Sequence, residues 1–227
     1  MERNPKLLAA TAVIVVIAAI VGAYFYRQSV QSPRRPTTTA VPAAPVGQLV
    51  REDSPSMGPE NAKVTLVEFF DPECESCAAF APVVKKIVAE NEGSIRLVLR
   101  YMPLHPNSNK AAAFLEEAGQ QGKYWPALQL LFAKQGEWGT RHGPPTSAPA
   151  PDVNALLKGY ANQLGLDAAR LETAIKENRY LQKLERDKKD GQSLGVRRTP
   201  TFFVNGRELA RFSENDLRAL IAEEMRK

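Results

Sequence analysis

Beyond about residue 50, short apolar runs alternate with segments of helical periodicity. Residues 63–70 (KVTLVEFF) are almost continuously apolar and rich in β-branched and aromatic side chains, which indicates a strand covered on both faces. The apolar side chains of residues 77–90 follow with helical spacing, and Pro82 is expected to kink this helix. Residues 95–101 (IRLVLRY) predict a second strand.

A long block of helical patterning follows the second strand. Helices are predicted over residues 108–121, 124–134, 152–164 and 167–185. Residues 136–151 are rich in glycine and proline, which interrupt the pattern and predict a loop. We interpret the whole block as a helical insertion between the second strand and the C-terminal elements.

The C-terminal residues predict a hairpin and a last helix. Residues 201–204 (TFFV) form a third predicted strand, and Asn205-Gly206 is a strong signal for a type I′ hairpin turn. Ser213 is placed to cap the following helix, with Asp216 at the capping-box position. The order strand, helix, strand, helical block, hairpin and helix predicts an α/β sheet with a helical insertion.

The N-terminal region predicts a membrane anchor. Residues 7–26 carry no charged side chain, and at about 1.5 Å per residue they are long enough to cross the apolar core of a bilayer. The aromatic residues 24–26 stand at one end, where an interfacial belt is expected. We therefore expect a transmembrane helix within residues 1–27. A cleavable signal peptide is the alternative, because residues 21–23 (VGA) offer a site of small side chains.

A linker and one folded domain follow the predicted anchor. Residues 28–50 are rich in proline, threonine and alanine, a composition that favours extended backbone and cannot bury a core, so we expect a flexible linker. Residues 51–227 then form the domain. A short flank before a single span places that domain outside the cytoplasm, although basic residues on both sides of the span do not decide the orientation. The expected location is the cell membrane, single-pass, with the domain on the periplasmic or extracytoplasmic side. The alternative is a soluble periplasmic protein after signal cleavage.

Composition and charge exclude some classes of function. The 227-residue chain is 44% hydrophobic and 24% charged, which is typical of a globular protein. Its net charge is +5, but lysine and arginine alternate with glutamate and aspartate along most of the chain. A nucleic-acid-binding face would show clustered basic residues with interleaved aromatic ones. We therefore expect no nucleic-acid partner.

The two cysteines, Cys74 and Cys77, carry the strongest chemical signal. As a structural disulfide the pair would contribute only roughly 2 kcal/mol, because the loop it closes is so short. A zinc site usually needs four ligands, and His105 and His142 are not at ligand spacing, so neither a metal nor another cofactor is expected. A C-x-x-C motif between a buried strand and a helix instead indicates redox exchange. Cys74 would be the attacking thiolate, exposed at the helix N-terminus, and Cys77 the inward-facing resolving thiol.

Two segments resemble the hallmarks of one known family. Residues 68–77 (EFFDPECESC) resemble the active-site segment of DsbA-like proteins, a thioredoxin-fold family of extracytoplasmic disulfide exchange proteins. Residues 195–206 (GVRRTPTFFVNG) resemble the second hallmark of that family. The resemblance covers roughly residues 50–227, and the helical block from about 104 to 190 matches the insertion that separates DsbA-like proteins from plain thioredoxin. It implies a thioredoxin-like fold with a helical insertion.

The resemblance also implies roles for single residues. Pro200 should follow a cis peptide bond and lie against the cysteine pair, which would leave the backbone of Thr199 free to bind a substrate strand. The alternative is a proline that only starts an edge strand. Glu68 should be a buried acid of raised pKa that takes the proton from Cys77, rather than a surface carboxylate. Arg100 on the next strand is a possible partner for Glu68. For His105 we expect a capping or surface role.

One departure from the family pattern concerns the redox potential. Strongly oxidising members have a histidine next to the second cysteine, where this chain has Ser76, and Glu73 and Glu75 flank Cys74. Two nearby carboxylates disfavour a thiolate and would raise the pKa of Cys74. On this basis we expect a potential more negative than that of a dedicated oxidase.

These residues predict a thiol-disulfide oxidoreductase that acts on cysteines of exported proteins. A membrane or soluble redox partner would reset the cysteines, and the short linker leaves no room for a dimerisation domain, which favours a monomer. An alternative of a different class is an extracytoplasmic binding or chaperone module in which the cysteines are not catalytic. A third reading is a two-cysteine metal site shared across a dimer.

Overall fold

The computed structural model describes residues 21–24, 44–140 and 150–227. Contacts divide the chain into two units, Met1–Val41 and Pro42–Lys227. In the first unit residues 21–24 are helical, and most of the predicted membrane span over residues 7–26 lies outside the described residues. Among the helices in the described ranges, none has both the length and the apolarity needed to cross a bilayer.

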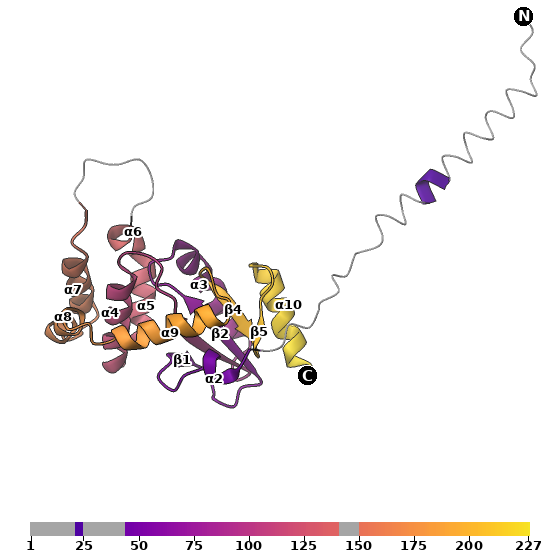
Figure 1. Cartoon of the computed structure of the whole chain (residues 1–227), viewed down its shortest axis with the longest axis horizontal. Helices are drawn as coiled ribbons and strands as arrows, with labels where there is room; N and C mark the ends of the chain where they lie inside the picture. The colour runs from indigo at the N-terminus through magenta and orange to yellow at the C-terminus, as the bar shows by residue number, and fades with distance from the viewer. Residues whose placement is uncertain (1–20, 25–43, 141–149) are drawn as a thin grey trace, which may run out of the picture. The chain divides into compact units, whose positions relative to one another are not determined.

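One mixed sheet of five strands forms the centre of the second unit (Figure 1). The strands lie in the order β1-β3-β2-β4-β5. Their bounds are β1 Ser56–Met57, β2 Val64–Phe70, β3 Ile95–Tyr101, β4 Thr201–Val204 and β5 Arg207–Glu208. Strands β2 and β3 are parallel and the other pairs are antiparallel. The central place of β2 explains its continuous apolar sequence, because both of its faces are covered.

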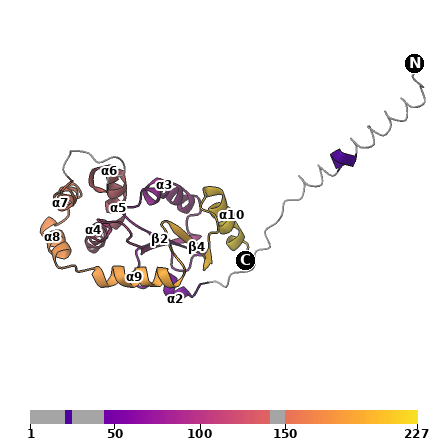
Figure 2. The same cartoon turned by 45° about the horizontal axis from the view of Figure 1, so that its top comes forward.

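Helices cover both faces of the sheet (Figure 2). On one face lie α3 (Glu75–Glu90) and α10 (Glu214–Met225). On the other lie α2 (Val46–Leu49) and α9 (Leu181–Ser193). The helical insertion is formed by α4 Ser108–Gln120, α5 Tyr124–Ala133, α6 Gln135–Trp138, α7 Val153–Gln163 and α8 Ala168–Lys176, which lead into α9. This is the thioredoxin-like α/β fold with a helical insertion that the sequence predicts.

Alternate residues of the central strands contribute to two separate cores. Leu66 and Phe70 of β2 pack in the larger core on the side of α3. Val67 and Phe69 point the other way and pack with Leu49 of α2. The sequence assigns residues 44–50 to the linker. Their contacts show instead that they pack on the folded unit. A β2 side chain can therefore contact only the helices on its own face of the sheet.

Local signals at the C-terminus are confirmed. Asn205 and Gly206 both have positive φ, 46° and 85°, as a type I′ turn between β4 and β5 requires. At the start of α10 the Ser213 hydroxyl accepts a hydrogen bond from the backbone N–H of Asp216 at 3.1 Å.

Two predicted boundaries in the insertion are wrong. The helix expected over residues 167–185 is broken, because α8 ends at Lys176 and α9 begins at Leu181. Asn178 between them has φ of 51°, which a helix cannot accommodate. The loop expected from residue 136 instead starts as α6, whose Trp138 is fully buried and donates from Nε1 to the Leu131 carbonyl at 2.9 Å. Residues 141–149 lie outside the described part of the chain.

The pairing suggested between Arg100 and Glu68 is wrong. Glu68 lies opposite Leu99 in the parallel register, whereas Arg100 lies opposite Phe69 and faces α9. The guanidinium of Arg100 is 0% exposed and bonds Asp187 at 2.9 Å and Asp190 at 2.6 Å. It thus joins α9 to the sheet, on the opposite face from Glu68.

Removing this buried cation is expected to destabilise the fold strongly. Arg100→Leu would leave Asp187 buried without its main partner, and breaking a buried ion pair typically costs about 3–5 kcal/mol. Urea unfolding should show a loss of that order. Arg51→Leu is the matched control, because Arg51 bonds the same Asp190 from a partly exposed position and should cost about 1 kcal/mol or less. Equal losses in both variants would contradict the buried-pair argument.

Candidate active site

A fixed turn places Cys74 at the start of α3. The turn follows directly from β2, and Cys74 is the N-cap residue of α3 with extended backbone. The Asp71 carbonyl accepts a hydrogen bond from the N–H of Cys74 at 3.0 Å, and the Asp71 carboxylate accepts one from the N–H of Glu73 at 2.9 Å. Because a helix N-terminus has unpaired N–H groups, this position favours a negatively charged sulfur.

Both cysteines are thiols in this structure, and they differ in burial. Cys74 is 7% exposed and Cys77 is 0% exposed. The order matches the expected roles, with the first sulfur outermost. Cys74 is nevertheless less exposed than the sequence suggests, because it also packs toward the loop before β4. Its Sγ lies 3.4 Å from the Thr199 carbonyl.

The pKa of Cys74 is lowered from the ordinary thiol value to about 5. The largest cause is a hydrogen bond from the side chain of Cys77 to the Cys74 sulfur. Burial acts in the opposite direction, and further hydrogen bonds from the Thr199 side chain and from the N–H groups of Cys77 and Ser76 favour the thiolate. The 3.4 Å contact with the Thr199 carbonyl serves only a protonated sulfur. The several donors outweigh that single acceptor, so the thiolate is the favoured form at neutral pH.

The expected rise in the Cys74 pKa is therefore wrong. The buried Glu73 carboxylate turns away to the insertion, where Oε2 accepts from the N–H of Asn107 at 2.6 Å and Oε1 accepts from the hydroxyl of Thr140 at 2.7 Å. Glu75 is exposed, so water screens its charge. Neither carboxylate is among the main influences on Cys74. The expected redox potential, more negative than that of a dedicated oxidase, depended on a raised Cys74 pKa and is no longer supported.

Cys77 and Glu68 are held in their neutral forms. Burial raises the pKa of the Cys77 thiol well above its ordinary value, and the hydrogen bond to Cys74 and the charges of Glu68 and Cys74 add to the rise. Burial also raises the pKa of Glu68 to about 8, with a smaller contribution from the negative charge of Cys74. Glu68 is 6% exposed, and its side chain forms no hydrogen bond or ion pair within the described ranges. The buried acid of raised pKa is as expected.

Pro200 follows a cis peptide bond, as expected. The preceding residue, Thr199, is half-buried and contacts the Cys74 sulfur through its carbonyl. The structure thus brings Cys74, Cys77, Thr199 and Pro200 to one site. Strand β4 begins directly after Pro200 and pairs with β2, which fixes this loop next to the cysteines.

Asp71 and His105 form a polar cluster beside the cysteines that the sequence does not single out. His105 Nδ1 lies 2.7 Å from Asp71 Oδ2, and the same oxygen accepts from the N–H of Leu104 at 2.7 Å. His105 does not cap α4, because the N-cap residue is Asn107; the backbone N–H of His105 donates to the Ser108 hydroxyl at 3.1 Å. One signal could have found the cluster. Strands β2 and β3 are parallel, so the loops that follow them meet at the same edge of the sheet.

His105 lies close enough to Cys74 for their charges to interact. Burial works against the protonated ring, but the hydrogen bond to Asp71 and the negative charges of Asp71, Cys74 and Glu73 outweigh it and raise the pKa of His105. A protonated His105 therefore favours the Cys74 thiolate through the same interaction.

Alkylation kinetics are expected to show this low thiol pKa directly. The rate at which iodoacetamide modifies Cys74 should rise with pH around a midpoint of about 5. His105→Gln should move the midpoint upward, because the nearby cation is lost, whereas Glu75→Gln, the matched exposed control, should leave it unchanged. A wild-type midpoint near the ordinary thiol value of about 8.5 would contradict the assigned thiolate.

The fold and the site define a thioredoxin-fold protein with a C-x-x-C centre and a neighbouring cis-proline. The thioredoxin family profile matches residues 51–223. The chain belongs to the thioredoxin family.

Solved structures of DsbA-like proteins share this fold. Oxidised BdbD from Bacillus subtilis is similar with a TM-score of 0.69 and 24% identity, over 82% of this chain and 99% of that one. A thioredoxin-like oxidoreductase from Silicibacter pomeroyi gives a TM-score of 0.66 and 24% identity, over 81% and 99%. For α-DsbA1 from Wolbachia pipientis the values are 0.65 and 20%, over 78% and 95%. The DsbA-like architecture expected from the sequence is confirmed.

Sequence relatives carry a different name. The chain is 36% identical to the Na(+)/H(+) antiporter NhaA of Herminiimonas arsenicoxydans over 152 residues, which are 67% of this chain and 22% of that protein. It is 37% identical to NhaA 1 of Salinispora arenicola (strain CNS-205) over 153 residues, 66% and 21% of the two chains. The chain thus spans about a fifth of the length of the curated relatives it matches.

Proposed function

We propose that the chain is a thiol-disulfide oxidoreductase that acts on cysteines of exported proteins through a redox-active Cys74–Cys77 pair. The observation that carries this proposal is the opposite shift of two neighbouring thiols, with the pKa of Cys74 lowered to about 5 and that of Cys77 well raised. The Cys74 sulfur is thus a thiolate that can attack, and the Cys77 sulfur stays protonated until the second step. The shared fold with DsbA-like structures supports the same reaction class. Antiport, named for the sequence relatives, is not part of the proposal.

In the reductive direction the reaction has two exchange steps. The Cys74 thiolate attacks one sulfur of a client disulfide, forms a mixed disulfide and releases the other client sulfur as a thiolate. Cys77 then loses its proton and attacks Cys74 Sγ, which forms the Cys74–Cys77 disulfide and releases the second client thiolate. The client gains two electrons and the pair loses two. The oxidative direction is the reverse, and Thr199 would position the client strand beside Cys74.

The first step prepares Glu68 to act as a base in the second. The negative charge on Cys74 is one cause of the raised Glu68 pKa. Forming the mixed disulfide removes this charge, so the Glu68 pKa falls and the carboxyl ionises more readily. A carboxylate then lies next to the Cys77 thiol, whose pKa responds to the charge on Glu68. The two exchange steps are thereby coupled through one buried acid.

The same electrostatics favour oxidation of clients. A stabilised Cys74 thiolate stabilises the reduced pair, and a stabilised reduced form makes the disulfide a stronger oxidant. We propose that electrons flow from client thiols into the Cys74–Cys77 disulfide and that a membrane or soluble redox partner removes them. We also propose an N-terminal anchor within residues 1–27 and a linker that starts at residue 28 and ends before the packed segment 44–50. The monomeric domain would lie on the extracytoplasmic side, or the protein would be periplasmic after signal cleavage.

Insulin reduction by the full chain tests the proposed reaction. With dithiothreitol as reductant, the wild type should accelerate the precipitation of the insulin B chain. The alternative function, a binding module with passive cysteines, would hold an unfolded client without accelerating reduction. A wild type that suppresses client aggregation but leaves the insulin rate at background would overturn the oxidoreductase and favour the binding module.

A further inference from the structure

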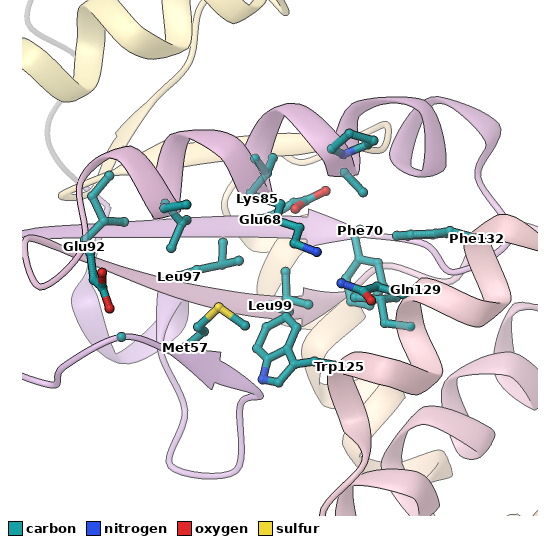
Figure 3. Close-up of a pocket in the computed structure, with 18 of the residues that line it drawn as sticks. Met57, Glu68, Phe70, Lys85, Glu92, Leu97, Leu99, Trp125, Gln129 and Phe132 are labelled. Atoms are coloured by element: carbon teal, nitrogen blue, oxygen red, sulfur yellow. The ribbon is translucent and has the colours of Figure 1, made fainter. Parts of the chain in front are cut away.

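A large apolar pocket lies between α3, the sheet and the helical insertion (Figure 3). Its volume is about 940 Å³, at the upper end of the range for cavities that hold drug-sized molecules. Leu97 and Leu99 of β3 line one wall, Ala81 and Val88 of α3 another, and Trp125 of α5 closes one side. Cys74, Thr199 and Pro200 are not among its lining residues, so the pocket is separate from the client-facing surface of the cysteines.

Of the described residues, Glu68 is the one buried ionisable group that lines this pocket. In Figure 3 the side chains of Glu68 and Lys85 lie close together, and Leu99 and Trp125 lie below them in the view. Glu68 is 6% exposed and lines the pocket, and within the described ranges its carboxyl has no hydrogen-bonding partner in the protein. A buried polar group without a partner costs free energy, and such groups are normally satisfied by protein, water or a ligand.

The charges at the pocket rim do not suit an ionic ligand. Lys85 and Glu92 are exposed and of opposite sign, so water solvates both and no net charge is left at the opening. The carboxyl of Glu68 is protonated at neutral pH, because its pKa is about 8. A protonated carboxyl can donate one hydrogen bond and accept others. The lining is otherwise dominated by aliphatic and aromatic side chains.

We propose that this pocket binds an uncharged apolar molecule with a carbonyl or hydroxyl group, whose oxygen hydrogen-bonds the Glu68 carboxyl. The apolar body would fill the space between α3, β3 and Trp125. A consequence, which rests on the proposed function, is regulation. A ligand bonded to Glu68 holds the proton that Glu68 must exchange with Cys77, so occupancy slows the second exchange step.

The uncharged fluorophore 6-propionyl-2-dimethylaminonaphthalene tests binding without reference to catalysis. It carries a carbonyl on an apolar ring system, and its emission shifts to the blue in apolar surroundings. The reduced full chain should give saturable, blue-shifted emission with one site. Ala81→Phe fills the pocket and should weaken binding at least tenfold. Ala79→Phe makes the same change on an exposed part of α3 outside the pocket and should leave binding unchanged.

Further variants separate the hydrogen bond from the packing. Glu68→Leu removes the partner and should weaken binding severalfold, whereas Glu68→Gln keeps a hydrogen-bonding group and should retain most of it. If Ala81→Phe fails to fold, Ala89→Phe replaces it, because Ala89 lines the pocket from an exposed position. Absence of saturable binding to the wild type, or equal losses with Ala79→Phe and Ala81→Phe, would overturn the proposed site.

Competition and kinetics distinguish the remaining outcomes. 1-Octanol should displace the fluorophore and octanoate should not; the opposite result would overturn the uncharged class in favour of an anionic ligand at Lys85. Saturating 1-octanol should slow insulin reduction by the wild type severalfold and leave Ala81→Phe unaffected. Binding without slowing would overturn the regulatory consequence alone. A chain that lacks reductase activity but binds the fluorophore would overturn the proposed function and leave the pocket assignment standing.

Discussion

Serine in place of Cys74 is expected to reduce insulin reduction to the uncatalysed background. In the proposed reaction Cys74 forms the mixed disulfide with a client, because Cys77 is fully buried and its pKa is well above the ordinary thiol value. A serine hydroxyl at position 74 occupies nearly the same space but is not a nucleophile toward disulfides. The comparison of initial rates with the wild type at equal protein concentration measures the effect.

Serine in place of Cys77 is expected to trap mixed disulfides between Cys74 and its clients. Cys74 still attacks, but no resolving thiol follows, so mixed disulfides with clients accumulate and persist on non-reducing gels. The double variant Cys74→Ser/Cys77→Ser is the control and should trap nothing. Mass spectrometry of the trapped species would identify the clients and the redox partner together. Equal trapping through Cys77 in the Cys74→Ser variant would contradict the assigned roles.

The choice of replacement at Cys77 also tests the cause of the low Cys74 pKa. The hydrogen bond from Cys77 is the largest contribution to that shift. Cys77→Ser retains a donor and should keep the alkylation midpoint of Cys74 low. Cys77→Ala removes the donor and should move the midpoint upward. Identical midpoints in the two variants would mean that the backbone N–H groups of α3 carry the effect instead.

Leucine in place of Glu68 is expected to slow the resolution of a mixed disulfide by about 10²-fold, the lower range for loss of a general acid or base. The first attack by Cys74 should change little, because Glu68 is not a main influence on the Cys74 pKa. Stopped-flow measurement of the two phases separates the steps. Glu68→Gln, which keeps the size but cannot exchange the proton, should show the same slow second phase. An unchanged second phase in both variants would exclude Glu68 as the proton acceptor.

Relative to the wild type, the Glu68→Leu and Glu68→Gln variants are expected to become more stable as pH rises. The Glu68 pKa of about 8 lies above the ordinary value, so the unfolded chain ionises this carboxyl first. The wild type therefore loses stability from Glu68 as pH rises from the ordinary carboxyl range toward 8, and below that range the loss disappears. Glu68→Gln removes this dependence. Its advantage over the wild type in urea unfolding should grow from pH 4 to pH 8.

Much of the candidate site could be predicted from local sequence. A strand that is apolar on both faces must be central, and a C-x-x-C after it must start the next helix, so the places of Cys74 and Cys77 follow from chain order. The burial and raised pKa of Glu68 follow equally, because its neighbours in β2 are all apolar. The hairpin at Asn205 and the cap at Ser213 depend on residues within a few positions of each other.

What the sequence by itself determined is thus the set of short-range features: the elements, the two sulfurs, the buried acid and the proline that faces them. Only the tertiary structure decided the electrostatics. The β2–β3 register turned Arg100 away from Glu68, and contacts with Asn107 and Thr140 turned the Glu73 carboxylate away from Cys74. His105 came to the site because two parallel strands end at one edge. Charges act through space over a few ångströms, and that distance is set by folding rather than by separation along the chain.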